Sequence, residues 1–372
     1  MKKISFSIAF FTLFYLITCN ASVLPTIPVP FKSGTGVIDN KKIIYIGLGS
    51  AGKSWFKMDL NQDDKQWTPI ANFPGVAREQ ATSVFINGNI YVFGGFGKSQ
   101  SGLTEVLHDI YKYNPEKNEW SELMSHSPVG LVGHSSFTYN GKAIIMGGVN
   151  ENIFNGYFED LANTNNDAGL KNKIVSKYFG KPVNDYFYNK QIISFDPETE
   201  LWGSLGSFPY AGTAGSTIIT EKNNKILIVN GEVKPGLRTP TAYEGEIRGN
   251  RIDWHPVASV ANPDGVAGGF GGICNGSAIF AGGASFPGSS KNYVQGHYYA
   301  HEGLQKKYSD TVYIFSKNKW IKAGNLPIGI AYGVSIPWNN GLLIIGGETT
   351  GGKANPDSMF LQVSKEKLSV AY

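Results

Sequence analysis

Residues 89–95 read Asn-Ile-Tyr-Val-Phe-Gly-Gly, and this stretch decides the fold of the 372-residue chain. Apolar β-branched and aromatic residues lead into a pair of glycines, and an Asn87-Gly88 turn precedes them. Such a pattern is typical of a buried strand entered through a tight turn. Close copies stand at residues 143–148, 278–283 and 342–347, and looser copies at 43–47 and 226–231. A strand that recurs six times predicts a repeat architecture.

The copies follow a regular spacing. Gly47, Gly94 and Gly147 are separated by 47 and 53 residues, whereas the later intervals are longer and indicate insertions. A tryptophan closes most units, at Trp67, Trp120, Trp202, Trp254 and Trp320. A glycine pair followed by a tryptophan, at a period of about fifty residues, resembles the kelch repeat with four strands in each blade. The resemblance implies an all-β, six-bladed kelch-type β-propeller; a two-sheet sandwich with chance glycines is the disfavoured alternative.

The two ends of the chain should meet in the last blade. The last unit lacks its tryptophan, and Leu368 stands in that place. Residues 23–31 are rich in proline and resemble the stretch that follows the other tryptophans, such as residues 67–70. We therefore expect the N-terminal segment to complete blade six and close the ring. Closure removes the exposed sheet edge that otherwise invites aggregation.

The first 21 residues have the composition of a secretory signal peptide. Lys2 and Lys3 precede an apolar run that is short for a membrane span, and small residues come before the expected cleavage after Ala21. A lipoprotein anchored through Cys19 is the alternative, which Thr18 disfavours. The prediction is a periplasmic protein whose residues 22–372 form one propeller domain without a membrane span.

Composition argues against several classes of function. The formal net charge is +4 without a basic block or stripe, so nucleic-acid binding has no support. After cleavage Cys274 would be the only cysteine, in a strand pattern that suits a buried, inert thiol. We expect no metal and no other cofactor, and either a monomer or a homodimer.

Two insertions interrupt the repeat, at about residues 150–189 and 286–308. Residues 158–162 and 168–179 have helix-like spacing, and aromatic residues are frequent in both insertions. Both insertions follow the glycine pair of their blade, so both should emerge on one face of the disc. Long insertions are often lids or binding loops, although a packing cap is equally consistent with the pattern. Aromatic and polar side chains around a central channel suit a sugar.

Polar residues cluster at positions that should ring the mouth of the central channel. Glu232 replaces the second glycine of its pair, Arg238 follows six residues later, and Glu348 comes directly after another pair. The starts of the innermost strands add Arg78, Glu79, His134 and Tyr332. Each of these residues alone is more readily explained by a rim salt bridge or hydrogen bond. Together they predict a site for an anionic polar ligand.

Longer strings in blades three to six resemble the bacterial periplasmic N-acetylneuraminate epimerase family. These strings are residues 152–161, 231–239, 263–270, 299–304 and 331–335 with 337–340. The resemblance implies conversion of the α-anomer of N-acetylneuraminic acid to the β-anomer, with Glu232 as the proton acceptor of a Gly-Glu-x-Lys-Pro-Gly motif. It also implies that free sialic acid is the small-molecule partner.

The residue types also suit this chemistry when taken by themselves. Mutarotation needs a base for the anomeric hydroxyl and an acid for the ring oxygen, and the two roles reverse when the ring closes again. Glu348, Glu79 and His134 all remain open as the partner acid. Arg238 and Arg78 are the candidates for binding the substrate carboxylate.

Other functions make different demands on the same fold. A non-catalytic sugar-binding propeller would use the same channel and insertions but would show no turnover. A copper oxidase needs a cysteine–tyrosine cofactor and paired histidines, which the lone Cys274 disfavours. A sialidase propeller carries a different repeat, and an intracellular adaptor does not fit a signal peptide.

Overall fold

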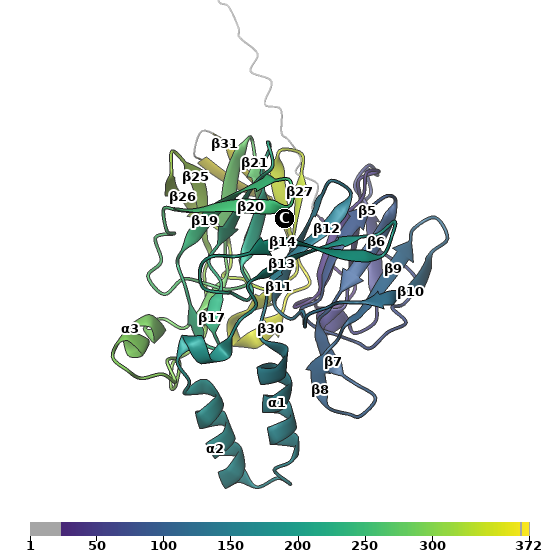
Figure 1. The fold of residues 1–372 in the computed structure, drawn as a ribbon. Coiled ribbons are helices and arrows are strands. Elements are labelled where there is room, and N and C mark those ends of the chain that lie inside the picture. Colours follow the sequence, from purple (N-terminus) through teal and green to yellow (C-terminus); the bar gives the residue numbers. More distant parts are fainter. Residues whose placement is uncertain (1–23, 365–366, 372) are drawn as a thin grey trace, which may run out of the picture.

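The computed structural model describes residues 24–364 and 367–371, so the expected signal peptide and Cys19 lie outside the described residues. Antiparallel strands form six four-stranded sheets, which stand around a central axis as the blades of a β-propeller (Figure 1). Each blade comes from one continuous part of the chain. The predicted all-β, six-bladed fold is confirmed.

The strands of each blade follow in chain order from the central channel outwards. Blade one comprises β1 (Thr35–Ile38), β2 (Ile43–Gly47), β3 (Trp55–Asp59) and β4 (Thr68–Pro69). Blade two comprises β5 (Thr82–Ile86), β6 (Asn89–Phe93), β9 (Asp109–Asn114) and β10 (Glu119–His126). Blade three comprises β11 (His134–Tyr139), β12 (Lys142–Gly147), β13 (Gln191–Asp196) and β14 (Leu201–Ser207). Blade four comprises β15 (Thr217–Thr220), β16 (Lys225–Val229), β19 (Ala242–Arg248) and β20 (Arg251–Val257). Blade five comprises β21 (Phe270–Cys274), β22 (Ser277–Ala281), β25 (Thr311–Ser316) and β26 (Lys319–Asn325). Blade six comprises β27 (Val334–Trp338), β28 (Gly341–Ile345), β31 (Ser358–Ser364) and β32 (Lys367–Ala371).

The core lies between neighbouring blades. The first strands line the channel and contact one another around the ring, and β1 contacts β27 where blade one meets blade six. The glycine-ended strands come second and are buried almost throughout, which explains their continuous apolar runs. Apolar side chains of facing sheets pack together, as those of blades two and three do.

Four of the five repeated tryptophans donate a hydrogen bond to a segment that comes before their blade. The Trp120 indole N–H donates to the Ala71 carbonyl at 2.9 Å, and that of Trp320 donates to the Ala258 carbonyl at 2.9 Å. Both acceptors lie just after the last strand of the preceding blade. The Trp202 indole N–H donates instead to the Ser125 hydroxyl at 3.0 Å, and that of Trp254 has no partner within residues 24–364 and 367–371, so this hydrogen bond accounts for only part of the repeated tryptophan. In β32, Leu368 takes the corresponding position, as the sequence predicts.

The closure of the ring differs from the prediction. The fourth strand of blade six is β32, and residues 24–31 form no strand of that sheet. The N-terminal segment instead fills the seam between blades six and one. Phe31 forms a single β-bridge with Asn355, and the Trp67 indole N–H donates to the Pro25 carbonyl at 3.1 Å. The prediction was wrong about the strand, because the C-terminus itself supplies enough chain to finish the sheet.

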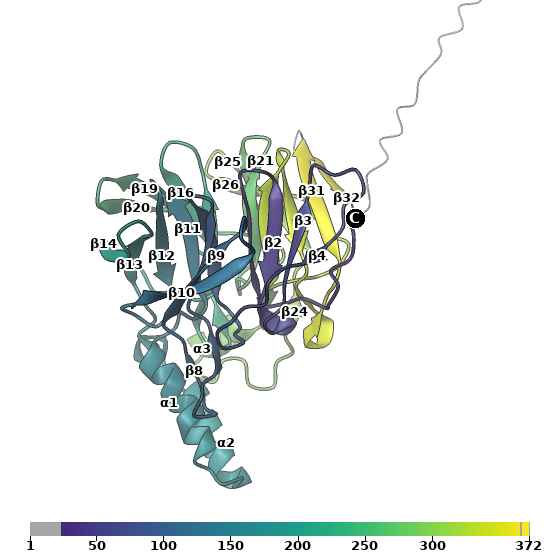
Figure 2. The same cartoon turned by 90° about the vertical axis from the view of Figure 1, so that its right-hand side faces the viewer.

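Both insertions emerge from the same face of the disc, as predicted (Figures 1 and 2). The first contains α1 (Glu151–Ala162), α2 (Ala168–Phe179) and η2 (Val183–Tyr186), and the second contains α3 (Ser289–Val294). α2 has the predicted bounds, whereas α1 begins earlier because Asn150 caps its N-terminus. Two short 3-10 turns lie elsewhere, η1 (Gly49–Ala51) and η3 (Thr350–Gly352).

Two-stranded ribbons extend from blades two, four, five and six on this face. They are β7 (Phe96–Lys98) with β8 (Thr104–Val106), β17 (Glu232–Lys234) with β18 (Leu237–Arg238), β23 (Ala284–Ser285) with β24 (Lys307–Tyr308), and β29 (Glu348–Thr349) with β30 (Lys353–Ala354). Each ribbon follows the second strand of its blade, so one face of the disc carries most of the irregular structure.

Candidate functional site

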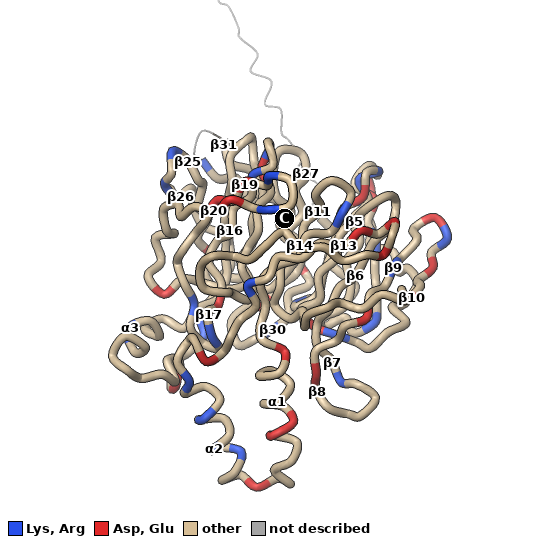
Figure 3. The backbone as a smooth tube through the Cα atoms, viewed as in Figure 1, with Lys and Arg blue, Asp and Glu red and all other residues tan. Residues whose placement is uncertain are grey.

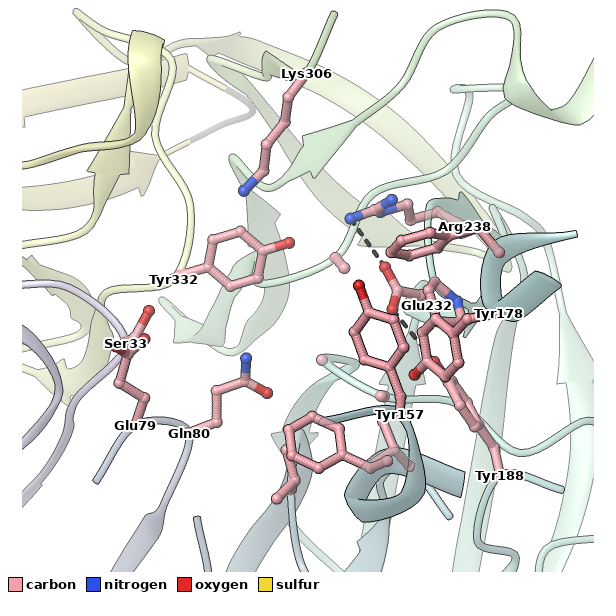
Figure 4. Close-up of a pocket in the computed structure, with 18 of the residues that line it drawn as sticks. Ser33, Glu79, Gln80, Tyr157, Tyr178, Tyr188, Glu232, Arg238, Lys306 and Tyr332 are labelled. Carbon is pink, nitrogen blue, oxygen red and sulfur yellow. Dashed lines mark hydrogen bonds and ion pairs between the residues drawn. The ribbon is translucent and has the colours of Figure 1, made fainter. Parts of the chain in front are cut away.

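A cavity of about 380 Å³ opens on the face that carries the insertions. Its wall combines residues from the starts of the innermost strands, from the ribbons and from both insertions (Figure 4). The charged and phenolic side chains that line it include Glu79, Glu232, Arg238, Lys306, Tyr332 and Glu348. The cavity therefore gathers residues from distant parts of the chain.

Glu232 begins β17 directly after a glycine whose backbone no other residue would tolerate. Gly231 has a φ of +120°, and a Cβ atom there would lie 2.2 Å from Ser216 Oγ. The Glu232 side chain is 20% exposed and lines the cavity. Its Oε2 lies 2.9 Å from Arg238 Nη2, and its Oε1 accepts a hydrogen bond from the Tyr188 hydroxyl at 3.3 Å. The carboxylate is thus fixed in position but still open to a ligand.

Arg238 faces Glu232 because the two residues are register partners in the β17–β18 ribbon. The arginine side chain is 5% exposed, and its guanidinium lies 4.8 Å from the centre of the Phe286 ring. Its Nε and Nη1 atoms are buried and have no hydrogen-bond partner within residues 24–364 and 367–371. Buried donors are normally satisfied, so the guanidinium lacks partners among the described residues, and its positive charge in the cavity wall suits an incoming carboxylate.

Glu348 is held in a different way. Its Oε2 accepts a hydrogen bond from Lys32 at 2.7 Å, and its Oε1 accepts one from the Tyr308 hydroxyl at 2.6 Å and one from Lys306. Burial acts to raise the pKa of Glu348, but the hydrogen bonds from Lys306, Lys32 and Tyr308 outweigh it and lower the pKa to about 2. The carboxylate is therefore ionised and paired at neutral pH, which does not suit a proton donor. It holds Lys306 at the cavity wall instead.

Two of the predicted contacts lie outside the cavity. The Arg78 guanidinium is buried, pairs with Asp109 through hydrogen bonds of 2.5 and 2.8 Å, and lies 4.9 Å from the Phe73 ring. His134 lies farther along the channel, with Nε2 at 2.7 Å from the Thr82 hydroxyl. Burial lowers the pKa of His134 to about 3, so it is neutral. We correct both assignments, because neither side chain is free to meet a ligand in the cavity.

Other residues of the cavity were missed in the sequence. Lys306 stands at the end of the second insertion, and Tyr157 and Tyr178 come from α1 and α2. Their rings stack with centroids 4.0 Å apart and form one wall. The long aromatic insertions were the available signal, but the repeat pattern does not say which of their side chains turn inwards. Ser33 and Gln80 were missed as well, although they neighbour the innermost strands.

Lys234 connects the two insertions beneath the cavity. It is fully buried, and its ammonium donates to the carbonyls of Phe179 at 2.8 Å, of Lys181 at 2.7 Å and of Tyr298. The first two carbonyls belong to the first insertion and the third to the second. Burial lowers the pKa of Lys234 to about 8, although Glu232 acts to raise it. One side chain from the ribbon of Glu232 and Arg238 thus holds both insertions together.

Figure 3 shows charges of both signs distributed over the molecule. Acidic residues lie on α1 and basic residues on α2. The part of the chain that the structure describes contains no group of three or more histidine, cysteine, aspartate or glutamate side chains arranged to hold a metal ion. None of its helices combines the length and the apolar character that crossing a membrane requires.

Comparisons with known proteins identify relatives over almost the whole chain. A family model described as N-acetylneuraminate epimerase matches residues 24–370. The N-acetylneuraminate epimerases of Escherichia coli O139:H28 and of Shigella boydii serotype 4 are each 56% identical over 351 residues, which cover 94% of this chain and 95% of the relative. A solved structure described as "Structure of YjhT" superposes with a TM-score of 0.92 at 55% identity, and the match covers 94% of this chain and all of that one.

Proposed function

This chain belongs to the N-acetylneuraminate epimerase family, and we propose that it converts the α-anomer of N-acetylneuraminic acid to the β-anomer. The observation that carries the proposal is the Glu232–Arg238 pair in the cavity wall. It combines a partly exposed carboxylate with a guanidinium that has two free donors. A base beside an anion-binding group is what the mutarotation of an acidic sugar requires.

The reaction proceeds by opening and closing of the ring. Glu232 accepts the proton of the anomeric hydroxyl, the bond between the anomeric carbon and the ring oxygen breaks, and the ring oxygen takes up a proton. The anomeric carbon is then a planar ketone. After rotation, the former ring hydroxyl attacks the other face of the ketone and loses its proton, while the ketone oxygen is protonated. Acid–base assistance of this kind contributes typically about 10²–10⁴-fold.

The second proton needs its own carrier. Of the three candidates, Glu348 is paired with lysines and ionised, and His134 lies outside the cavity. Glu79 lines the cavity, and no side-chain hydrogen bond or salt bridge holds its carboxylate within residues 24–364 and 367–371, so we assign it as the group that passes the second proton between solvent water and the sugar. In this assignment Glu79 and Glu232 approach the sugar from different blades.

The substrate carboxylate binds to Arg238. Its Nε and Nη1 donors are fixed in the wall, and a guanidinium holds a carboxylate more directionally than an ammonium does. Lys306 adds a second positive charge at the cavity, and its ammonium is kept in place by Glu348, whose other carboxylate oxygen pairs with Lys32. The tyrosine wall of the first insertion offers ring faces to the apolar side of the sugar.

We also propose that the protein works in the periplasm, where it would act on sialic acid before uptake. The support is the signal-peptide composition of residues 1–21. N-terminal sequencing of the protein from the periplasmic fraction tests this. A mature chain that begins at Ser22 supports the proposal, whereas an intact Met1 contradicts it.

The activity is tested by following anomers in real time. A sialidase releases α-N-acetylneuraminate, and proton NMR records its equilibration with and without the purified mature protein. We expect equilibration to become at least about tenfold faster at micromolar protein. An unchanged rate, together with saturable binding of the sugar, would instead identify a non-catalytic sugar-binding propeller.

A further inference from the structure

Six residues form a ring around the mouth of the central channel. Each stands just before the innermost strand of its blade: Ser33, Gln80, Gly133, Gly215, Gly268 and Tyr332. Backbone hydrogen bonds join five of the six neighbouring pairs. The N–H of Ser33 donates to the Tyr332 carbonyl at 2.8 Å, that of Gln80 to Ser33 at 2.9 Å, that of Gly215 to Gly133 at 2.7 Å, that of Gly268 to Gly215 at 2.8 Å, and that of Tyr332 to Gly268 at 2.8 Å.

All six residues have a left-handed backbone. Their φ angles lie between +54° for Ser33 and +67° for Gly268. Glycine adopts this conformation freely, whereas other residues pay for it in free energy. Three blades use glycine at this position, so the ring itself does not require a side chain. The asparagines found at many other left-handed positions tolerate this conformation well, but serine, glutamine and tyrosine do not share that tolerance.

The three exceptions all line the cavity. Ser33 and Gln80 lie across it from Glu232 and Arg238 (Figure 4), whereas the Tyr332 hydroxyl points towards the Arg238 guanidinium and the Tyr332 ring lies 4.7 Å from the Lys306 ammonium. The three exceptions come from the adjacent blades one, two and six, and they present a hydroxyl, an amide and a phenol. Strained residues that persist where glycine would suffice are typical of ligand contacts.

We propose that Ser33 and Gln80 form a subsite that selects the acetamido group and the neighbouring hydroxyl of the sugar. In the pyranose ring of N-acetylneuraminic acid, the acetamido-bearing carbon stands across the ring from the anomeric carbon. A sugar whose anomeric centre meets Glu232 and whose carboxylate meets Arg238 therefore turns its acetamido group towards the opposite wall. Neutral donors and acceptors match that group, and they discriminate against analogues that lack it.

This inference rests on the proposed function for the orientation of the sugar, and it is tested by removing the strained side chains. The variants are Gln80→Gly and Ser33→Gly in the mature protein. We expect kcat/KM for the α-anomer to fall about tenfold in Gln80→Gly, and several-fold in Ser33→Gly. The melting temperature should stay within about 2 °C of wild type or rise, because glycine relieves the backbone strain. Loss of function without loss of stability separates a ligand contact from a structural role.

A second substrate makes the test specific. An analogue with a hydroxyl in place of the acetamido group should react more slowly than N-acetylneuraminate in the wild type, and this preference should shrink at least about threefold in Gln80→Gly. The variant Gln80→Asn keeps an amide that tolerates the left-handed conformation, and it should retain part of the preference. Lys42→Gly is the control, since Lys42 has a φ of +63° in the β1–β2 turn, outside the cavity.

The outcomes separate this inference from the proposed function. If the wild type accelerates equilibration but both glycine variants match it in kcat/KM and in substrate preference, the subsite is wrong and the function stands. A melting temperature that falls by more than about 5 °C in both variants would also overturn the subsite, because it would show a structural role. If the wild type neither catalyses nor binds, as judged by calorimetry with the equilibrated sugar, both ideas fail together.

Discussion

Glu232 and Arg238 have separate roles in the proposed reaction, since the carboxylate accepts a proton and the guanidinium binds the carboxylate of the sugar. The ribbon register places them opposite each other, and the buried guanidinium would be costly without a carboxylate beside it. One contact of 2.9 Å meets that need and leaves the Glu232 carboxylate partly exposed. The Nε and Nη1 donors of the arginine stay free. The pair therefore combines a carboxylate that is able to accept a proton from an acid sugar with a positive charge that attracts the carboxylate of that sugar.

Glu232→Gln separates the proton transfer from binding. The amide keeps the size and the hydrogen-bonding capacity of the side chain but accepts no proton at neutral pH, so we expect kcat to fall by about 10²-fold or more. Affinity for the sugar should change little. The NMR anomer assay gives the rate, and calorimetry gives the affinity.

Glu246→Gln is the matched control for this variant, because Glu246 pairs with Arg248 on the surface. It should keep the wild-type rate. A well-folded Glu232→Gln protein that equilibrates the anomers at the wild-type rate would remove Glu232 from the mechanism.

Arg238→Ala should mainly weaken the binding of the sugar and affect kcat less, because the contact with the substrate carboxylate is lost.

Glu348 predicts a particular dependence of stability on pH. Its pKa is lowered from an ordinary value of 4.5 to about 2, so the folded state favours the ionised form. The resulting stabilisation is fully present above pH 4.5, and it is lost as the pH falls from about 4.5 to about 2. In Glu348→Gln we expect the free energy of unfolding to fall by up to about 3 kcal/mol at pH 7, and the difference from wild type to narrow towards pH 2.

Urea denaturation at pH 7, 4 and 3 measures this difference. Glu198→Gln serves as the control, because Glu198 makes only a surface hydrogen bond with Asn87. A stability difference between wild type and Glu348→Gln that does not change over this pH range contradicts the low pKa.

The sequence predicts helical structure in the first insertion, but it does not predict the contacts between the insertions and the ribbons. Residues 168–179 were predicted as a helix with the observed bounds, because apolar spacing and an Asp167 cap are local signals. The contacts of Lys234 involve carbonyls that are more than fifty residues away in the chain, and no local pattern encodes them. Arg78 was misassigned for the same reason, since its partner Asp109 lies on another strand.

Lys234→Met is predicted to loosen both insertions together. Methionine fills much of the space but leaves three buried carbonyls without their donor, which we expect to lower the free energy of unfolding by about 2–4 kcal/mol. Hydrogen exchange should rise at residues 179–183 and 298–301, and kcat/KM should fall because the cavity walls lose their support. Lys177→Met, at an exposed position of α2, is the control. Protection that falls in only one insertion would contradict the connecting role of Lys234.

The propeller as a whole follows from the repeated strand, whereas its closure does not. Six copies of one glycine-ended strand and a recurring tryptophan were sufficient to predict six blades and the face that carries the insertions. The fourth strand of blade six was assigned to the wrong terminus, because β32 lacks the tryptophan and residues 24–31 resemble a segment that follows one. Both segments contribute, β32 as the strand and the N-terminus as the filling of the seam.

Phe31 lies in the seam between blades six and one, and its substitution tests how the ring is closed. Its side chain is fully buried against blades one and six, and its carbonyl accepts a hydrogen bond from Gly347 at 2.7 Å. Phe31→Ala leaves a cavity where the ring closes, so we expect the free energy of unfolding to fall by about 3–5 kcal/mol. Hydrogen exchange should rise first in β1 and β27, which flank the seam. Phe187→Ala removes a ring that is 70% exposed and should change the stability by less than about 0.5 kcal/mol. If exchange instead rises equally in all six blades, closure does not depend on this segment, and the ring opens as one unit.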